Sequence, residues 1–173
     1  MMIGSGVLII IFLVLYLILQ PGQNTRDFDI ASAPINYDQP LHAIHEMDEP
    51  GQPKKAIPFL PKDGPQPMIL IPVTSYDFGQ VGATEVVTHD FVIANIGEAP
   101  LTISRAYTSC GCTTADFTST VIPPGEKAMV TIRFDAGFHD VRGQVVRRYL
   151  VIESNDPANS ELRIYIQAAV QPS

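Results

Sequence analysis

The segment 108–114 reads Thr-Ser-Cys-Gly-Cys-Thr-Thr and contains both cysteines of the chain, Cys110 and Cys112. A disulfide between them is the first chemistry to consider. In a regular strand their Cβ atoms would lie about 6–7 Å apart, whereas a disulfide requires about 3.8 Å. Gly111 can adopt a positive φ that folds the backbone and brings the sulfurs together. A bridge made in this way would be strained and therefore easily reduced.

A two-thiolate metal site and a structural role are the other interpretations of the Cys-Gly-Cys segment. Copper(I) or zinc(II) would need one or two further ligands, and His89 and His139 are the only imidazoles after residue 67. Alternatively, Cys110 and Cys112 are small buried side chains at a bend beside a β-bulge. The sequence leaves all three interpretations open. We assign no metal and no cofactor here, and keep Cu or Zn at the two cysteines as an alternative.

The remaining sequence contains no recognisable catalytic set. It has no Gly-x-Ser-x-Gly segment and no phosphate-binding loop of the Walker or Rossmann type. His42 and His45 could share a helical face, but they lie between Pro40 and Pro50, where a stable helix is not expected. The chain has 18 Asp+Glu against 11 Lys+Arg, which argues against a nucleic-acid partner. We predict a protein that is not an enzyme and has no small-molecule substrate.

The elements around the two cysteines are predicted to be β-strands. In the segment 127–135 the apolar side chains Ala128, Val130, Ile132 and Phe134 alternate with polar ones. Strict alternation indicates half-buried antiparallel strands, and the segments 86–95, 144–153 and 162–170 follow the same pattern. Turn signals separate them, such as Pro-Pro-Gly-Glu at 123–126. Residues 68–173 therefore predict an all-β, immunoglobulin-like antiparallel sandwich.

A series of short motifs in this region resembles the bacterial family called domain of unknown function 1573. The resemblance covers about residues 68–171 and implies a fold related to the Hydin-type and major-sperm-protein-like immunoglobulin folds. It implies no chemistry, because the family has no established activity and its relatives serve mainly as binding or scaffolding modules. In order along the chain, the motifs are Tyr-Asp-Phe-Gly-Gln-Val at 76–81, Phe-Val-Ile-Ala-Asn-Ile-Gly at 91–97, Pro-Leu-Thr-Ile at 100–103, Thr-Ser-Cys-Gly-Cys-Thr at 108–113, Pro-Pro-Gly-Glu at 123–126 and Ser-Asn-Asp-Pro at 154–157.

The chain begins with an apolar run, Ile3 to Leu19, that carries no charge. Seventeen residues are the lower limit for a helix that crosses a bilayer. No basic segment precedes the run and no small-x-small cleavage site follows it, so an uncleaved signal-anchor is favoured over a cleaved signal peptide. We predict a transmembrane helix at residues 1–20, in contact with lipid through residues 3–19. By analogy with signal-anchors, the N-terminus is expected in the cytoplasm and the C-terminal domain outside it.

Residues 21–67 are predicted to form a Pro-rich extended linker. Nine of the 15 prolines fall in this segment, which shows no sustained period-2 or period-3.6 pattern. Two interpretations stay open, a flexible spacer and a strap that lies on a partner. Small apolar clusters support the strap, because a spacer that buries nothing has little need of such side chains. The candidate partner-binding residues are Phe28, Ile30, Ile35, Tyr37, Ile57, Phe59 and Leu60.

These observations together predict a membrane-anchored accessory subunit. Its extracytoplasmic domain and linker would dock onto other subunits of a larger membrane protein complex, for which a respiratory or photosynthetic electron-transfer complex is one expectation. The alternative is a membrane-tethered thiol or copper-binding module, or a disulfide redox module, that acts through Cys110 and Cys112.

Overall fold

The computed structural model describes residues 28–45, 55–58 and 60–173. The anchor predicted at residues 1–20 and the candidate residue Phe59 lie outside the described residues. Within the described part, every regular element is a β-strand, as the sequence predicted. No helix in this part of the chain is long and apolar enough to cross a membrane.

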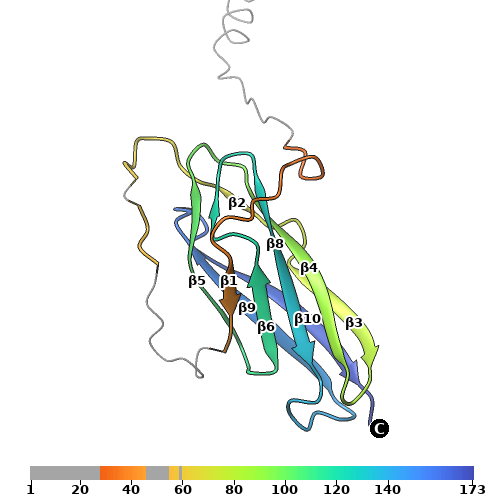
Figure 1. Ribbon diagram of the computed structural model, residues 1–173. Helices are drawn as coiled ribbons and strands as arrows, with labels where there is room; N and C mark the ends of the chain where they lie inside the picture. The colour runs from red at the N-terminus through yellow and green to blue at the C-terminus, as the bar shows by residue number, and fades with distance from the viewer. Residues whose placement is uncertain (1–27, 46–54, 59) are drawn as a thin grey trace, which may run out of the picture.

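Ten strands form two five-stranded sheets that pack face to face as a sandwich (Figure 1). The first sheet has the order β1-β6-β8-β4-β2 and the second has the order β3-β10-β9-β5-β7. In chain order the strands are β1 (Leu41–Ala43), β2 (Ile69–Leu70), β3 (Ser75–Val81), β4 (Val86–Asn95), β5 (Leu101–Thr108), β6 (Thr113–Phe117), β7 (Val121–Ile122), β8 (Lys127–Asp135), β9 (Val145–Ser154) and β10 (Glu161–Val170).

One ladder corrects the prediction of a wholly antiparallel sandwich. Strand β3 pairs in parallel with β10, and the register shifts between Gln167 and Ala169. Beside this shift Gly79 adopts φ +68°, and its amide donates to Oδ1 of Asp77 at 2.8 Å. The resulting bulge interrupts the edge of the second sheet, which makes further strand pairing at that edge less favourable.

The core lies between the two sheets and consists of aliphatic and aromatic side chains. The alternation predicted for β8 is confirmed, because Ala128, Val130, Ile132 and Phe134 are at most 1% exposed. Phe91 and Ile93 of β4 are buried beside them, at 2% and 0%. Burying one such large apolar side chain contributes about 1.5–3 kcal/mol, and the core is built without a tryptophan.

The turn between β4 and β5 is held by one buried side chain, Asn95, which is 0% exposed. Its Nδ2 donates to the carbonyl oxygens of Ala99 at 2.8 Å and Ile122 at 2.9 Å. Its Oδ1 accepts from the amides of Gly97 at 3.0 Å and Met68 at 3.3 Å. The side-chain amide of Asn95 thus forms hydrogen bonds with four backbone groups at this end of the sandwich.

Residues 28–45, which we call the N-terminal strap, lie against the chain's own sandwich (Figure 1). Strand β1 pairs antiparallel with β6, and Ala43 is 1% exposed within the core. Ile35 forms a parallel bridge with Lys127. The Nζ of Lys127 also donates to the carbonyl oxygens of Ile30 at 2.7 Å and Ala31 at 3.1 Å. Backbone hydrogen bonds therefore fix the strap along most of its length.

The chain then crosses from one sheet to the other. The amide of Thr108 in β5 donates to the carbonyl of Ile44 at 3.0 Å, and the amide of Lys55 donates to the carbonyl of Ser104 at 2.8 Å. The chain therefore covers the outer edges of both β6 and β5, which would otherwise expose unpaired backbone groups. The sequence predicted a strap on a partner or a free spacer, whereas the described residues show a strap on its own domain.

Candidate functional site

The two cysteines form a disulfide in the turn between β5 and β6. The Cα atoms of Cys110 and Cys112 are 5.3 Å apart, and the amide of Thr113 donates to the carbonyl of Cys110 at 3.1 Å. The disulfide interpretation of the sequence is the one that the structure displays. The positive φ expected for Gly111 is wrong, because the positive-φ glycines of the described chain lie at other positions. The hydrogen-bonded turn itself brings the sulfurs together.

The two sulfurs have different surroundings. Cys112 is 3% exposed and belongs to the core, whereas Cys110 is only partly buried. The Nε of Arg148, on β9, donates to Sγ of Cys112 at 3.2 Å, and its Nη1 donates to the carbonyl of Arg147 at 2.9 Å. The second bond fixes the guanidinium in place. The guanidinium of Arg148 therefore donates directly to the sulfur of the buried cysteine.

The candidate metal ligands His89 and His139 are engaged elsewhere. The ring of His89 stacks on Tyr76 with centroids 3.5 Å apart, at the seam between β4 and β3. His139 is exposed in the loop after β8 and packs edge-on against Phe138. Beside it, the hydrogen bond from Arg142 lowers the pKa of Asp140. The described residues contain no group of three His, Cys, Asp or Glu side chains that could hold a metal ion.

The outer face of the second sheet carries tyrosines and arginines in adjacent rows. Tyr149 and Tyr165 face each other across β9 and β10 with ring centroids 6.0 Å apart. The guanidinium of Arg163 lies 5.3 Å from the ring of Tyr149. On β5, the guanidinium of Arg105 lies 4.4 Å from the ring of Tyr107. These contacts are close enough for cation–π attraction, which orders the long arginine side chains.

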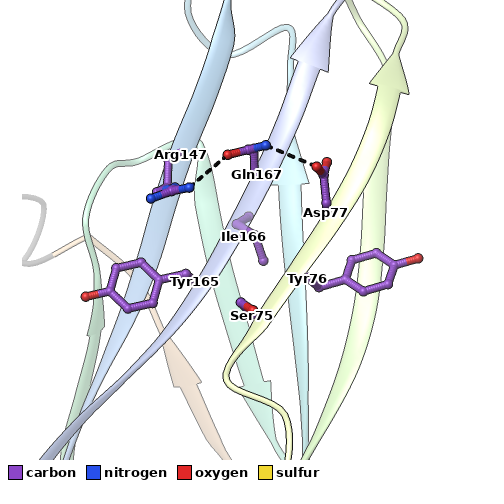
Figure 2. A pocket seen from close by; sticks show the side chains of 7 residues that line it. All are labelled: Ser75, Tyr76, Asp77, Arg147, Tyr165, Ile166 and Gln167. Carbon is purple, nitrogen blue, oxygen red and sulfur yellow. Dashed lines mark hydrogen bonds between the residues drawn. The ribbon is translucent and has the colours of Figure 1, made fainter.

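The next row continues this face across three strands (Figure 2). The Nη2 of Arg147 donates to Oε1 of Gln167 at 3.1 Å. The Nε2 of Gln167 in turn donates to Oδ2 of Asp77 at 3.0 Å. A shallow hollow of about 400 Å³ lies here. Figure 2 shows Tyr165 below the Arg147 end of the row and Tyr76 below the Asp77 end. We call the surface the Tyr/Arg face and define it by Arg105, Tyr107, Arg147, Tyr149, Arg163 and Tyr165.

The outer face of the first sheet has a different character. Its central rows are Thr88–Arg133–Thr114 and Asp90–Thr131–Asp116. Apart from Arg133, which contacts Asp135, these are short polar side chains. Thr131 Oγ1 donates to Oδ1 of Asp90 at 2.6 Å. Small threonines and solvated carboxylates offer little contact area. Of the two outer faces, the Tyr/Arg face is thus the better candidate for a binding surface.

The candidate partner-binding residues of 21–67 differ in exposure. Tyr37 and Ile57 are 69% and 46% exposed. The remaining described members, Phe28, Ile30, Ile35 and Leu60, are half-buried. A role in binding a partner stays a prediction for all of them. His42 lies on β1 and its Nδ1 contacts Oδ1 of Asp116 at 2.6 Å, in an exposed pair.

Most of the sequence motifs prove to be structural. Oδ1 of Asn155 accepts from the amide of Thr102 at 2.7 Å. Asp156 is 1% exposed, and its carboxylate accepts from three amides, those of Ala158 at 2.7 Å, Ile69 at 2.9 Å and Asn159 at 3.1 Å. Like Asn95, these side chains close turns. The Cys-Gly-Cys motif is the one whose contacts point to chemistry.

The motif order along the chain corresponds to a known family. The family described as "Protein of unknown function (DUF1573)" matches residues 69–170. The chain belongs to this family. The resemblance predicted from the sequence is confirmed, and it covers the sandwich from β2 to the end of β10. No curated protein matches the DUF1573 chain.

Solved structures add information about the fold of the DUF1573 chain. A protein of unknown function from Porphyromonas gingivalis W83 is 26% identical, with a TM-score of 0.55 over 60% of this chain and 46% of its own. This chain thus spans less than half of that relative. The PapD-like domain 7 of human CEP192 is 12% identical over 70% of this chain and 99% of its own, with a TM-score of 0.47. The secreted serine protease VesC from Vibrio cholerae matches at 16% identity and a TM-score of 0.42, over 54% of this chain and 21% of its own.

Proposed function

We propose that this chain is a non-catalytic, membrane-anchored accessory subunit whose sandwich docks onto a larger membrane protein complex. The observation that carries the proposal is the Tyr/Arg face. Tyrosine and arginine are enriched among the residues that dominate binding energy at protein interfaces. The rings are rigid, and the guanidinium groups are already ordered by ring contacts and hydrogen bonds, so little side-chain freedom would be lost on binding.

The balance of charge on this face favours a protein surface as the partner. Arg105 contacts Glu153 at 3.4 Å and Arg163 contacts Glu161 at 3.0 Å. Two of the three arginines are thus already neutralised, which makes the face amphipathic rather than strongly basic. A surface with exposed apolar groups and hydrogen-bond acceptors would complement it.

The anchor and the location outside the cytoplasm belong to the same proposal. The uncharged run Ile3–Leu19 supports a membrane helix. The disulfide supports an extracytoplasmic domain, because structural disulfides are rare in the reducing cytosol. Two weak attachments on one chain, to lipid and to protein, bind together far better than either does alone.

The test is co-purification of the full chain, expressed at its native level, from detergent-solubilised membranes. We expect it to elute with a fixed set of integral membrane subunits in constant ratio. The identity of those subunits would also test the expectation of a respiratory or photosynthetic complex. The Tyr149→Ser/Tyr165→Ser double variant should lose this association, because it removes the two central rings of the Tyr/Arg face.

A matched control truncates a cross-strand pair on the opposite face. Val92 and Met129 face each other across β4 and β8, as Tyr149 and Tyr165 do across β9 and β10. The Val92→Ala/Met129→Ala variant should keep the subunits. A chain that elutes as a free monomer, or a double tyrosine variant that keeps its partners, would refute the proposal.

A further inference from the structure

We propose that the Cys110–Cys112 disulfide is a thiol–disulfide exchange site that takes a dithiol of a neighbouring polypeptide as its substrate. In this proposal the substrate thiolate attacks Cys110, and Arg148 stabilises the departing sulfur of Cys112. The inference goes beyond docking and does not depend on it, because it rests on the contacts of the two sulfurs alone.

The two cysteines differ in their access to solvent. Cys112 is 3% exposed and is packed in the core. Cys110 and its neighbours Ser109 and Gly111 are only partly buried, at the turn that ends β5. Exchange requires that the thiolate approach one sulfur and expel the other. A thiolate from outside therefore meets Cys110, and Cys112 is the leaving sulfur.

The leaving sulfur lies beside a positively charged side chain. Negative charge develops on Sγ of Cys112 as the bond breaks, and the Nε of Arg148 already donates to this atom at 3.2 Å. A hydrogen bond from a charged donor is about twice as strong as a neutral one. Among the described residues, Cys110 Sγ accepts from the neutral amide of Cys112 at 3.1 Å and has a distant contact with Thr113 Oγ1 at 3.9 Å. The stronger donor thus faces the sulfur that must leave.

Within the residues that the structure describes, Arg148 makes no ion pair with a carboxylate. In the described part of the chain, its guanidinium donates to the sulfur of Cys112 and to the carbonyl of Arg147. Four other arginines of the sandwich contact a carboxylate: Arg105, Arg133, Arg142 and Arg163. The positive charge of Arg148 is therefore available to a thiolate.

The exchange balances in two steps. In the first, the substrate thiolate bonds to Cys110 Sγ, the Cys110–Cys112 bond breaks, and its electron pair leaves on Cys112 as a thiolate. In the second, the other substrate thiol loses its proton and attacks the substrate sulfur of the mixed disulfide, which releases Cys110 as a thiolate. The substrate dithiol loses two electrons and two protons and becomes a disulfide. The chain gains the two electrons, and its sulfurs take up protons to the extent that pH dictates.

The test measures how fast dithiothreitol reduces the oxidised full chain in detergent, by acid quench, alkylation with N-ethylmaleimide and mass analysis. Arg148→Met should slow reduction about tenfold, because the leaving sulfur loses its charged donor. Arg148→Lys keeps the charge and should lose less of the rate. Arg133→Met is the matched control, since it removes one positive charge whose partner is Asp135 and not a sulfur. It should react at the wild-type rate.

A second measurement identifies the attacked sulfur. The oxidised chain is treated with glutathione and trapped with N-ethylmaleimide, and the modified peptides are mapped. We expect glutathione on Cys110 and maleimide on Cys112. Glutathione found mainly on Cys112 would overturn the proposal. The same holds if Arg148→Met, with a wild-type circular dichroism spectrum, is reduced as fast as Arg133→Met. Loss of partner co-purification in the Tyr149→Ser/Tyr165→Ser variant would not bear on either result.

Discussion

Reduction of the Cys110–Cys112 bridge should cost the fold little, and this cost can be calculated. The cysteines are two positions apart, so the bridge closes a loop of only three residues. A disulfide stabilises mainly by restricting the unfolded chain, and the restriction grows with loop length. For three residues the lost entropy is about 5.4 cal/mol/K, which corresponds to about 1.6 kcal/mol at 25 °C. A loop of about 15 residues would give about 3 kcal/mol.

The assay is urea unfolding of the full chain in detergent, with and without a phosphine reductant. The chain has six tyrosines and no tryptophan, so far-ultraviolet circular dichroism and tyrosine fluorescence are suitable signals. With an m-value of about 2 kcal/mol/M, a loss of about 1.6 kcal/mol lowers the midpoint by about 0.8 M. The Cys110→Ser/Cys112→Ser variant should show no response to the reductant.

A loss above about 4 kcal/mol would refute this reasoning. The bridge would then be a main support of the fold, as disulfides of small secreted domains are, and reversible reduction would unfold a large fraction of the molecules. A small loss means that the chain remains folded in both redox states, which an exchange site requires.

Three further predictions concern the fold. Asn95→Ala should lower the free energy of unfolding by about 4 kcal/mol, because it leaves two buried carbonyl oxygens unpaired at about 1–3 kcal/mol each. In the same urea titration, the more exposed Asn155→Ala should cost about 1–2 kcal/mol. Gly125 has φ +80°, so Gly125→Ala should lower the free energy of unfolding by about 1–2 kcal/mol, measured by thermal unfolding. Gly82 has an ordinary φ, so the control Gly82→Ala should lower it less. Lys127→Met removes both hydrogen bonds to the carbonyl oxygens of the strap. Amide hydrogen exchange at residues 28–36 should therefore become several-fold faster. Unchanged exchange would show that these two bonds are not needed to hold the strap.

The long strands could be predicted from the sequence because their pattern is local. In β8 and β10, apolar and polar residues alternate along the chain, which shows directly which side chains face the core. The predicted bounds agree with the structure within one residue for β4, β8, β9 and β10. The short strands could not be predicted. β1, β2 and β7 have two or three residues each, too few to show a period, and their stability depends on hydrogen bonds to distant strands.

The candidate sites divide in the same way. Cys110 and Cys112 could be found, because their spacing is a local property. Arg148 could not, since it lies 36 positions from Cys112 in the sequence and only the arrangement of β9 beside β5 places it at the sulfur. The Tyr/Arg face could have been predicted from the residue types at the outward positions of two strands. In β9 and β10 the outward positions hold arginine, tyrosine and valine or glutamine instead of the short polar residues of an ordinary solvent face.

The strap changes how far the sandwich can move from the membrane. If residues 21–67 were a flexible spacer, one of the two interpretations of the sequence, 47 residues of free linker would separate the proposed anchor from the domain. The contact of Lys127 with the carbonyl of Ile30 leaves only ten residues, 21–30, between them. Whatever their conformation, ten residues span at most about 35 Å, against about 165 Å for the longer linker.

With the anchor as proposed, a shorter tether would keep the domain in a thin layer above the bilayer. Local concentration falls with about the three-halves power of linker length, so the shorter tether raises the concentration of the Tyr/Arg face near a membrane partner about tenfold. It also limits the height at which that partner can be contacted. A binding site more than about 35 Å plus the width of the sandwich above the membrane is out of reach. The partner surface is therefore expected close to the bilayer.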